Sequence, residues 1–167
     1  MYFINMLRPV LPLLLLAVAS PLWARDSLGV FGQWGAFAEP ERQRCYAIAT
    51  ADESRARRDF QPYASVGTWP RRNVRSQVHF RLSRELAERA NVRLAIGGAR
   101  FDLIAGEGDA WATSASEDAA IVTAMRAAGR MSIRATDNRG NRFSDYYNLD
   151  GAATAIDAAN VGCTRRE

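Results

Sequence analysis

The stretch "NVRLAIGGARFDLIA", residues 91–105, specifies its local fold most clearly. Gly97 and Gly98 predict a two-residue turn, because glycine readily adopts the positive φ angles that such turns require. With this turn Leu94 faces Phe101, and the apolar side chains of both arms lie on one face. The segment therefore predicts a β-hairpin whose turn and hydrophobic pattern agree on one register.

Further strands are expected on both sides of this hairpin. Residues alternate between apolar and polar along Arg75–Ser83, with Val78 and Phe80 on the apolar face, which indicates a half-buried strand. Asp52–Val66 is polar, rich in arginine and contains Pro62, so it is predicted to be a long loop. The remaining predicted strands are Phe31–Ala38, Arg44–Ala51, Met131–Asp137 and Arg142–Leu149.

Two helices complete the prediction. Ser116–Ala128 has an apolar stripe at helical spacing, Ser116 as a candidate N-cap and Gly129 as a stop. Gly151–Val161 is rich in alanine and is expected to end at Gly162. The total is about seven strands and two short helices, with most strands arriving as hairpins. The expected fold is mainly β (α+β), an antiparallel β-sandwich or partly open barrel.

Residues 1–24 have the layout of a secretory signal peptide. Arg8 provides a positive start, Val10–Leu22 is apolar, and the small residue Ala24 precedes a polar chain. The apolar run is short for a membrane span, and no second run reaches that length. The sequence therefore predicts one exported domain, Arg25–Glu167, located in the periplasm or at the cell surface, with no membrane span after leader cleavage.

The chain has two cysteines, Cys45 and Cys163. In an exported protein such a pair favours a disulfide. Closing so long a loop would stabilise the fold by roughly 4–5 kcal/mol in the chain-entropy model. The alternative is a free or catalytic thiol.

Positive charge is concentrated in the middle of the chain. All 22 basic residues are arginine, and residues 55–100 hold 11 of them against 3 acids. Such asymmetry is typical of a surface for an anionic partner, because guanidinium groups bind oxyanions through two donors. The alternative is a solvated face encoded by an arginine-rich genome, with the tryptophan packing structurally. The candidate anion-binding residues are Arg55, Arg57, Arg58, Trp69, Arg71, Arg72 and Arg75.

Residue types that usually carry catalysis or bind metals are sparse. His79 is the single histidine, and its strand position places it on the polar face beside Arg81. The acids around Trp111 lack the alternate spacing of a calcium loop. We therefore expect no metal, no cofactor and no catalytic residue, while a hydrolase using Cys45 or His79 remains the remote alternative.

Several strings together resemble the invasion-associated locus B family of bacterial envelope proteins. The resemblance covers nearly all of the chain after the leader, although many members have a further cysteine shortly after the first tryptophan, which is absent after Trp34. The matching strings are "FGQWGAF" (31–37), "RCYAIA" (44–49), "GDAWA" (108–112), "DAAIVTAMRAAGRMSIRA" (118–135) and "YYNLDGAATAIDAANVGC" (146–163).

This resemblance implies a β-rich periplasmic or surface-associated protein with no established catalytic reaction. The leading hypothesis is a non-enzymatic envelope protein that acts by binding or structural support. The alternative is a module that binds lipopolysaccharide or another polyanion through segment 55–75. The expected partner is an envelope protein or an anionic envelope component, and no nucleic acid is expected.

Overall fold

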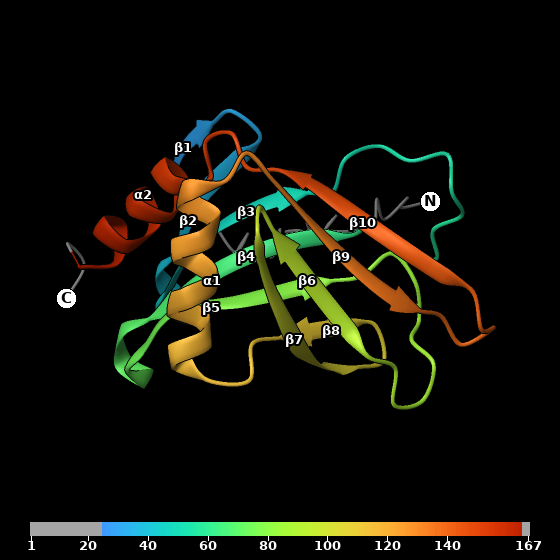
Figure 1. The fold of residues 1–167 in the computed structure, drawn as a ribbon. Helices are drawn as coiled ribbons and strands as arrows, with labels where there is room; N and C mark the ends of the chain where they lie inside the picture. The colour runs from blue at the N-terminus through green and yellow to red at the C-terminus, as the bar shows by residue number, and fades with distance from the viewer. Residues whose placement is uncertain (1–24, 165–167) are drawn as a thin grey trace, which may run out of the picture.

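A computed structural model describes residues 25–164 as a mainly antiparallel β protein with two α-helices (Figure 1). The N-terminal leader prediction lies outside the described residues. The strands are β1 (Asp26–Phe31), β2 (Trp34–Glu39), β3 (Arg44–Thr50), β4 (Tyr63–Trp69), β5 (Val74–Arg81), β6 (Val92–Ile96), β7 (Ala99–Gly106), β8 (Asp109–Trp111), β9 (Arg130–Thr136) and β10 (Arg142–Asn148). The helices are α1 (Ala115–Ala127) and α2 (Ala152–Thr164), with 3-10 turns η1 (Pro40–Arg42) and η2 (Pro70–Arg72).

All ten strands form one sheet in the order β1-β2-β3-β4-β5-β8-β7-β6-β9-β10. Every pairing is antiparallel, which confirms the mainly β, antiparallel part of the predicted fold class. The sheet is not closed, because β1 and β10 remain its edges. The predicted number of about seven strands is wrong.

The three missed strands lack strong sequence signals. β4 has the sequence "YASVGTW", whose small residues resemble a loop, although Val66 is buried in the core. β1 contains Gly29 at its bulge, while β8 has three residues. Pairing with neighbouring strands, rather than local β propensity, therefore determines these elements.

The hairpin predicted for residues 91–105 forms as β6 and β7. Leu94 pairs with Phe101 in the β6–β7 ladder, and Gly97 in the turn has a φ of 54°. The alternation of β5 is also confirmed, since Val78 and Phe80 are fully buried. Strong alternation and a glycine turn were sufficient to specify both elements.

Both helices differ from their predicted bounds. α1 is capped by Ser114, whose hydroxyl accepts the N–H of Glu117 at 3.2 Å, so the predicted cap Ser116 lies inside the helix. α2 continues through Gly162 to Thr164. Gly162 therefore does not end the helix; it lies against Leu28, where a Cβ atom would collide with that side chain.

The two helices pack against the first half of the sheet, α2 over β1–β4 and α1 over β5 (Figure 1). A disulfide joins Cys45 on β3 to Cys163 on α2, with a Cα–Cα distance of 5.7 Å, which confirms the predicted bridge. Trp34 is fully buried, and its indole N–H donates to the carbonyl of Asn148 at 2.9 Å. This bond connects the β2 side of the sheet with the end of β10. Within residues 25–164, no helix is both long and apolar enough to cross a membrane.

Candidate anion-binding groove

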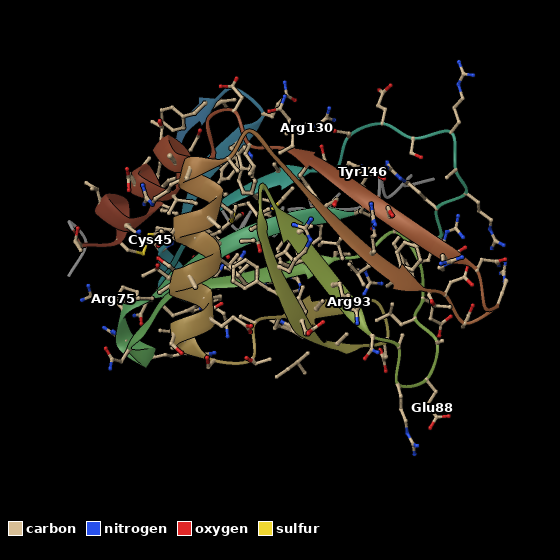
Figure 2. The ribbon with its side chains drawn as sticks, viewed as in Figure 1. Cys45, Arg75, Glu88, Arg93, Arg130 and Tyr146 are labelled. Carbon is tan, nitrogen blue, oxygen red and sulfur yellow. A yellow bond between two sulfur atoms is a disulfide. The ribbon has the colours of Figure 1, made fainter. Side chains whose placement is uncertain are left out.

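The predicted anion-binding residues form two groups that the fold separates. Arg55, Arg57 and Arg58 lie in the loop before β4, whereas Trp69 and the arginines of η2 lie at the other end of that strand. A strand of seven residues spans roughly 20 Å, so the two groups do not form one surface. In Figure 2 Arg75 lies at the end of the sheet away from Arg93, Arg130 and Tyr146.

Trp69 packs on the sheet. Its ring covers Gly67, where a Cβ atom would lie 2.7 Å from the indole. The guanidinium carbon of Arg44 lies 5.5 Å from the centre of the Trp69 ring. These contacts give Trp69 a structural role, while Arg71, Arg72 and Arg75 are exposed at the tip of the hairpin.

A larger concentration of arginines lines a groove of about 1720 Å³ on the second half of the sheet. We call it the arginine groove. Its floor is the outward face of β7, β6, β9 and β10, and residues 54–58 form one wall. It is lined by eight arginines: Arg57, Arg58, Arg84, Arg93, Arg100, Arg130, Arg134 and Arg142. The two acids that line it are Asp102 and Asp145.

Strand register brings the arginines of the floor together. Arg93 on β6 is directly opposite Arg134 on β9, and Arg134 is opposite Ser144 on β10. Arg142 lies two residues from Ser144 on the same face of β10. Like charges directly opposite each other destabilise a sheet. The fold therefore holds three guanidinium groups close together at an energetic cost.

The wall is attached to the sheet by the loop that follows β3. The Asp52 N–H donates to the carbonyl of Tyr146 at 2.8 Å, and the Asp52 carboxylate pairs with Arg130 at 2.6 Å. Farther along, Arg84 Nε donates to the carbonyl of Arg57 at 3.0 Å. The loop consequently runs beside β10 and carries Arg57 and Arg58 into the groove.

The arginines of the groove differ in how far their charge is compensated. Arg93 pairs with Asp102 at 3.3 Å between nitrogen and oxygen. Arg100 donates to backbone carbonyls of its own hairpin, including that of Gly97 at 3.2 Å. Arg134 and Arg142 form no ion pair with any residue from 25 to 164. These two guanidinium groups are available to an external anion.

Asp145, on the buried face of β10, also lines the groove and is 1% exposed. Burial raises the pKa of its carboxyl group, and this effect outweighs the hydrogen bonds from Ser83. One of these bonds runs from the Ser83 N–H at 2.9 Å. The neighbouring Tyr147 is fully buried, and burial followed by the charge of Asp145 raises the pKa of its hydroxyl. Asp145 therefore loses its negative charge at a higher pH than an ordinary aspartate does.

The residues of the remote hydrolase alternative lie elsewhere. The sulfur of Cys45 is bonded to Cys163 and is not a free thiol. His79 Nε2 lies 2.8 Å from Asp109 Oδ1, and its ring stacks on Trp111 with centroids 5.3 Å apart. Arg81 also pairs with Asp109 at 2.6 Å. The sequence did not reveal the acid beside His79, because Asp109 reaches it through the unpredicted strand β8.

The acids near Trp111 also have separate partners. Glu117 accepts the N–H of Thr113 at 2.6 Å, near the start of α1. Asp118 accepts the N–H of Val78 at 2.8 Å. Across residues 25–164, no group of three or more potential metal ligands is assembled.

Comparisons with family models, with curated proteins and with solved structures give no match to this chain. Six of the eight groove arginines were not among the predicted site residues, namely Arg84, Arg93, Arg100, Arg130, Arg134 and Arg142. Most of these arginines occupy the polar positions of alternating strands, which is a sequence signal for an exposed basic face. That signal indicates a binding surface only once the strand order is known to place β6 beside β9.

Proposed function

We propose that this chain is an exported, non-enzymatic envelope protein of the invasion-associated locus B type that binds anionic envelope material through the arginine groove. The observation that carries the proposal is the gathering of eight arginines and two acids around one groove. A groove lined by one sign of charge concentrates counter-ions of the opposite sign and accelerates their association.

The dimensions and chemistry of the groove favour a large anion. Its volume of about 1720 Å³ exceeds the roughly 300–1,000 Å³ of an ordinary small-molecule pocket. Arginine binds phosphate and sulfate through two parallel donors, which gives it geometric specificity as well as charge. A phosphorylated envelope polymer such as lipopolysaccharide fits both properties.

Export is supported by the bridge between Cys45 and Cys163, because disulfides persist in oxidising compartments. The envelope assignment otherwise depends on the resemblance described above and on the leader-like residues 1–24. N-terminal sequencing of protein recovered from the cell envelope should begin at or near Arg25. Recovery of a cytoplasmic product that retains Met1 would contradict export.

Binding is tested with two matched triple variants. The groove variant is Arg93→Ala/Arg134→Ala/Arg142→Ala, and the control is Arg71→Ala/Arg72→Ala/Arg75→Ala, which removes the same charge from η2 and β5. We expect the groove variant to bind heparin and lipopolysaccharide at least about tenfold more weakly, the equivalent of about 1.4 kcal/mol. The control should remain within about threefold of wild type, since long-range charge is screened at 0.15 M salt.

The salt dependence provides a second measurement on the same proteins. Each neutralised charge releases counterions, so wild-type affinity should fall steeply as salt rises, and the slope of the groove variant should be smaller. Equal affinity of the groove variant and wild type would contradict the proposal. Loss of binding in the Arg71→Ala/Arg72→Ala/Arg75→Ala control alone would show that the anion binds at η2 and not in the groove.

A further inference from the structure

The floor of the arginine groove has basic side chains at both ends of β9, separated on that strand by Ser132. Strand register places Arg93, Arg134 and Arg142 near one end of β9 and β10. Arg130 lies at the other end of β9, and Arg100 on β7 lines the same groove. We call the first group the Arg134 pole and the second the Arg130 pole.

The separation of the poles follows from strand geometry. Arg130 and Arg134 are four residues apart on β9, so both lie on the same face. At a rise of about 3.3 Å per residue their Cα atoms are roughly 13 Å apart. A single phosphate is too small to contact both poles, whereas a ligand with two phosphates separated by about that length can do so.

Between Arg130 and Arg134 on β9 lies a row formed by Ala95, Ser132 and Tyr146, which are directly opposite one another on β6, β9 and β10. Arg100 is opposite Ala95 at the β7 end of this row, where its guanidinium group bonds the carbonyls of Gly97 and Ala99 in its own hairpin. Tyr146 is 47% exposed, and Ser132 and Ser144 add hydroxyls nearby. A phenol ring beside hydroxyl groups suits a sugar, which presents apolar ring faces and polar edges.

We infer that the arginine groove recognises a short sugar core with a phosphate group at each end, one phosphate at each pole. This inference depends on the proposed function, because it specifies the ligand of the same groove. The Arg134 pole should bind its phosphate more tightly, since Arg134 and Arg142 have no ion pair within residues 25–164, whereas Arg130 is paired with Asp52. The ligand could be a glycolipid headgroup or a free phosphorylated glycan, which share this chemistry.

The inference is tested by titration calorimetry with four probes at fixed salt. They are inorganic phosphate, a disaccharide with one phosphate, the same disaccharide with a phosphate at each end, and that bisphosphate carried by acyl chains in vesicles. We expect the bisphosphate to bind at least about tenfold more tightly than the monophosphate, because its second phosphate binds in an intramolecular step. Free and acylated bisphosphate should bind alike.

Variants identify the poles. Arg130→Ala should bring bisphosphate affinity down toward the monophosphate level, with a smaller effect on monophosphate binding. Arg134→Ala/Arg142→Ala should weaken both ligands, while Arg134→Lys, which keeps the charge and loses the planar fork, should give an intermediate affinity. Arg72→Ala is the control, and circular dichroism checks that each variant is folded.

Different results would contradict the two-phosphate ligand and the binding of anions by the groove. Equal binding of monophosphate and bisphosphate, with heparin binding still dependent on the groove, would overturn the two-pole arrangement alone. Loss of groove-dependent heparin binding would overturn the proposed function as well. Binding of the acylated probe only would overturn sugar-phosphate recognition, because the acyl chains would then supply the affinity.

Discussion

Two arginine-rich regions of this molecule differ in how they are assembled. The turn around η2 has three arginines close in sequence, Arg71, Arg72 and Arg75, all exposed at a hairpin tip. The arginine groove collects eight from separate strands and loops around one hollow. A run of arginines in sequence therefore marks exposed charge, whereas a binding site for a large anion requires the fold to make charges converge.

The two regions also differ in energetic cost. At η2 each guanidinium projects into water, where repulsion between neighbours is small. In the groove, Arg93 is directly opposite Arg134, an arrangement that destabilises a sheet. Proteins tolerate such local conflicts mainly where function requires them. This cost is a second reason to place binding in the groove.

The largest predicted effect tests whether the two regions are structurally independent. The disulfide lies at the η2 end of the sheet, because Cys45 pairs with Thr68 in the β3–β4 ladder. Cys45→Ser/Cys163→Ser should lower the free energy of unfolding by roughly 2–5 kcal/mol, measured by urea denaturation. In native buffer this variant should bind heparin like wild type, since the groove lies beyond the far end of β4.

An unchanged unfolding midpoint would show that the bridge contributes nothing to stability. Weakened heparin binding by a folded Cys45→Ser/Cys163→Ser protein would show that the two ends of the sheet are coupled. Wild-type protein under reducing conditions provides the matched control, because it removes the bond without changing a residue.

The contrast between the regions also explains what sequence could predict. Elements with strong local signals were found, such as the hairpin around Gly97 and the alternating strand β5. The disulfide followed from the number of cysteines and the expected export. The hairpin and the strand could be predicted because each depends mainly on residues that are close together in the sequence.

Features that depend on distant pairing were missed. β4 has weak β propensity but is held between β3 and β5. The groove requires β9 to pair with β6 across about forty residues of sequence, which no local pattern specifies. The prediction grouped Arg57 with Arg71 because they are near in sequence, but β4 separates them.

A smaller effect is expected from the ion pair between Asp102 and Arg93, which reduces the positive charge of the groove. Asp102 compensates the charge of Arg93 at the edge of the Arg134 pole through a 3.3 Å ion pair. Asp102→Asn should raise groove affinity for heparin by about two- to fivefold, consistent with the 0.2–1 kcal/mol of an exposed pair. Asp157→Asn is the control, because it removes the same charge from the Arg126 pair between α1 and α2. If both variants gained affinity equally, net charge rather than groove charge would control binding.

The smallest predicted effect concerns pH and the buried carboxyl group of Asp145. Burial raises its pKa, so between its unfolded and folded pKa values the native state binds more protons than the unfolded chain. The contribution of Asp145 to the free energy of unfolding therefore falls as pH rises from the ordinary pKa of aspartate to the raised pKa of Asp145. Asp145→Asn retains an acceptor for the Ser83 N–H and should flatten the stability profile there.

Asp118 provides the matched control for this change, since burial also raises its pKa but it lies on α1 and outside the groove. Asp118→Asn and Asp145→Asn should both flatten the stability profile. Wild-type affinity for heparin should rise as pH falls, because Asp145 loses its negative charge. Asp145→Asn, but not Asp118→Asn, should make this rise smaller by about twofold, since salt screens the charge. If the two variants had the same effect on binding, Asp145 would act only through folding, and the arginines alone would set the affinity of the groove.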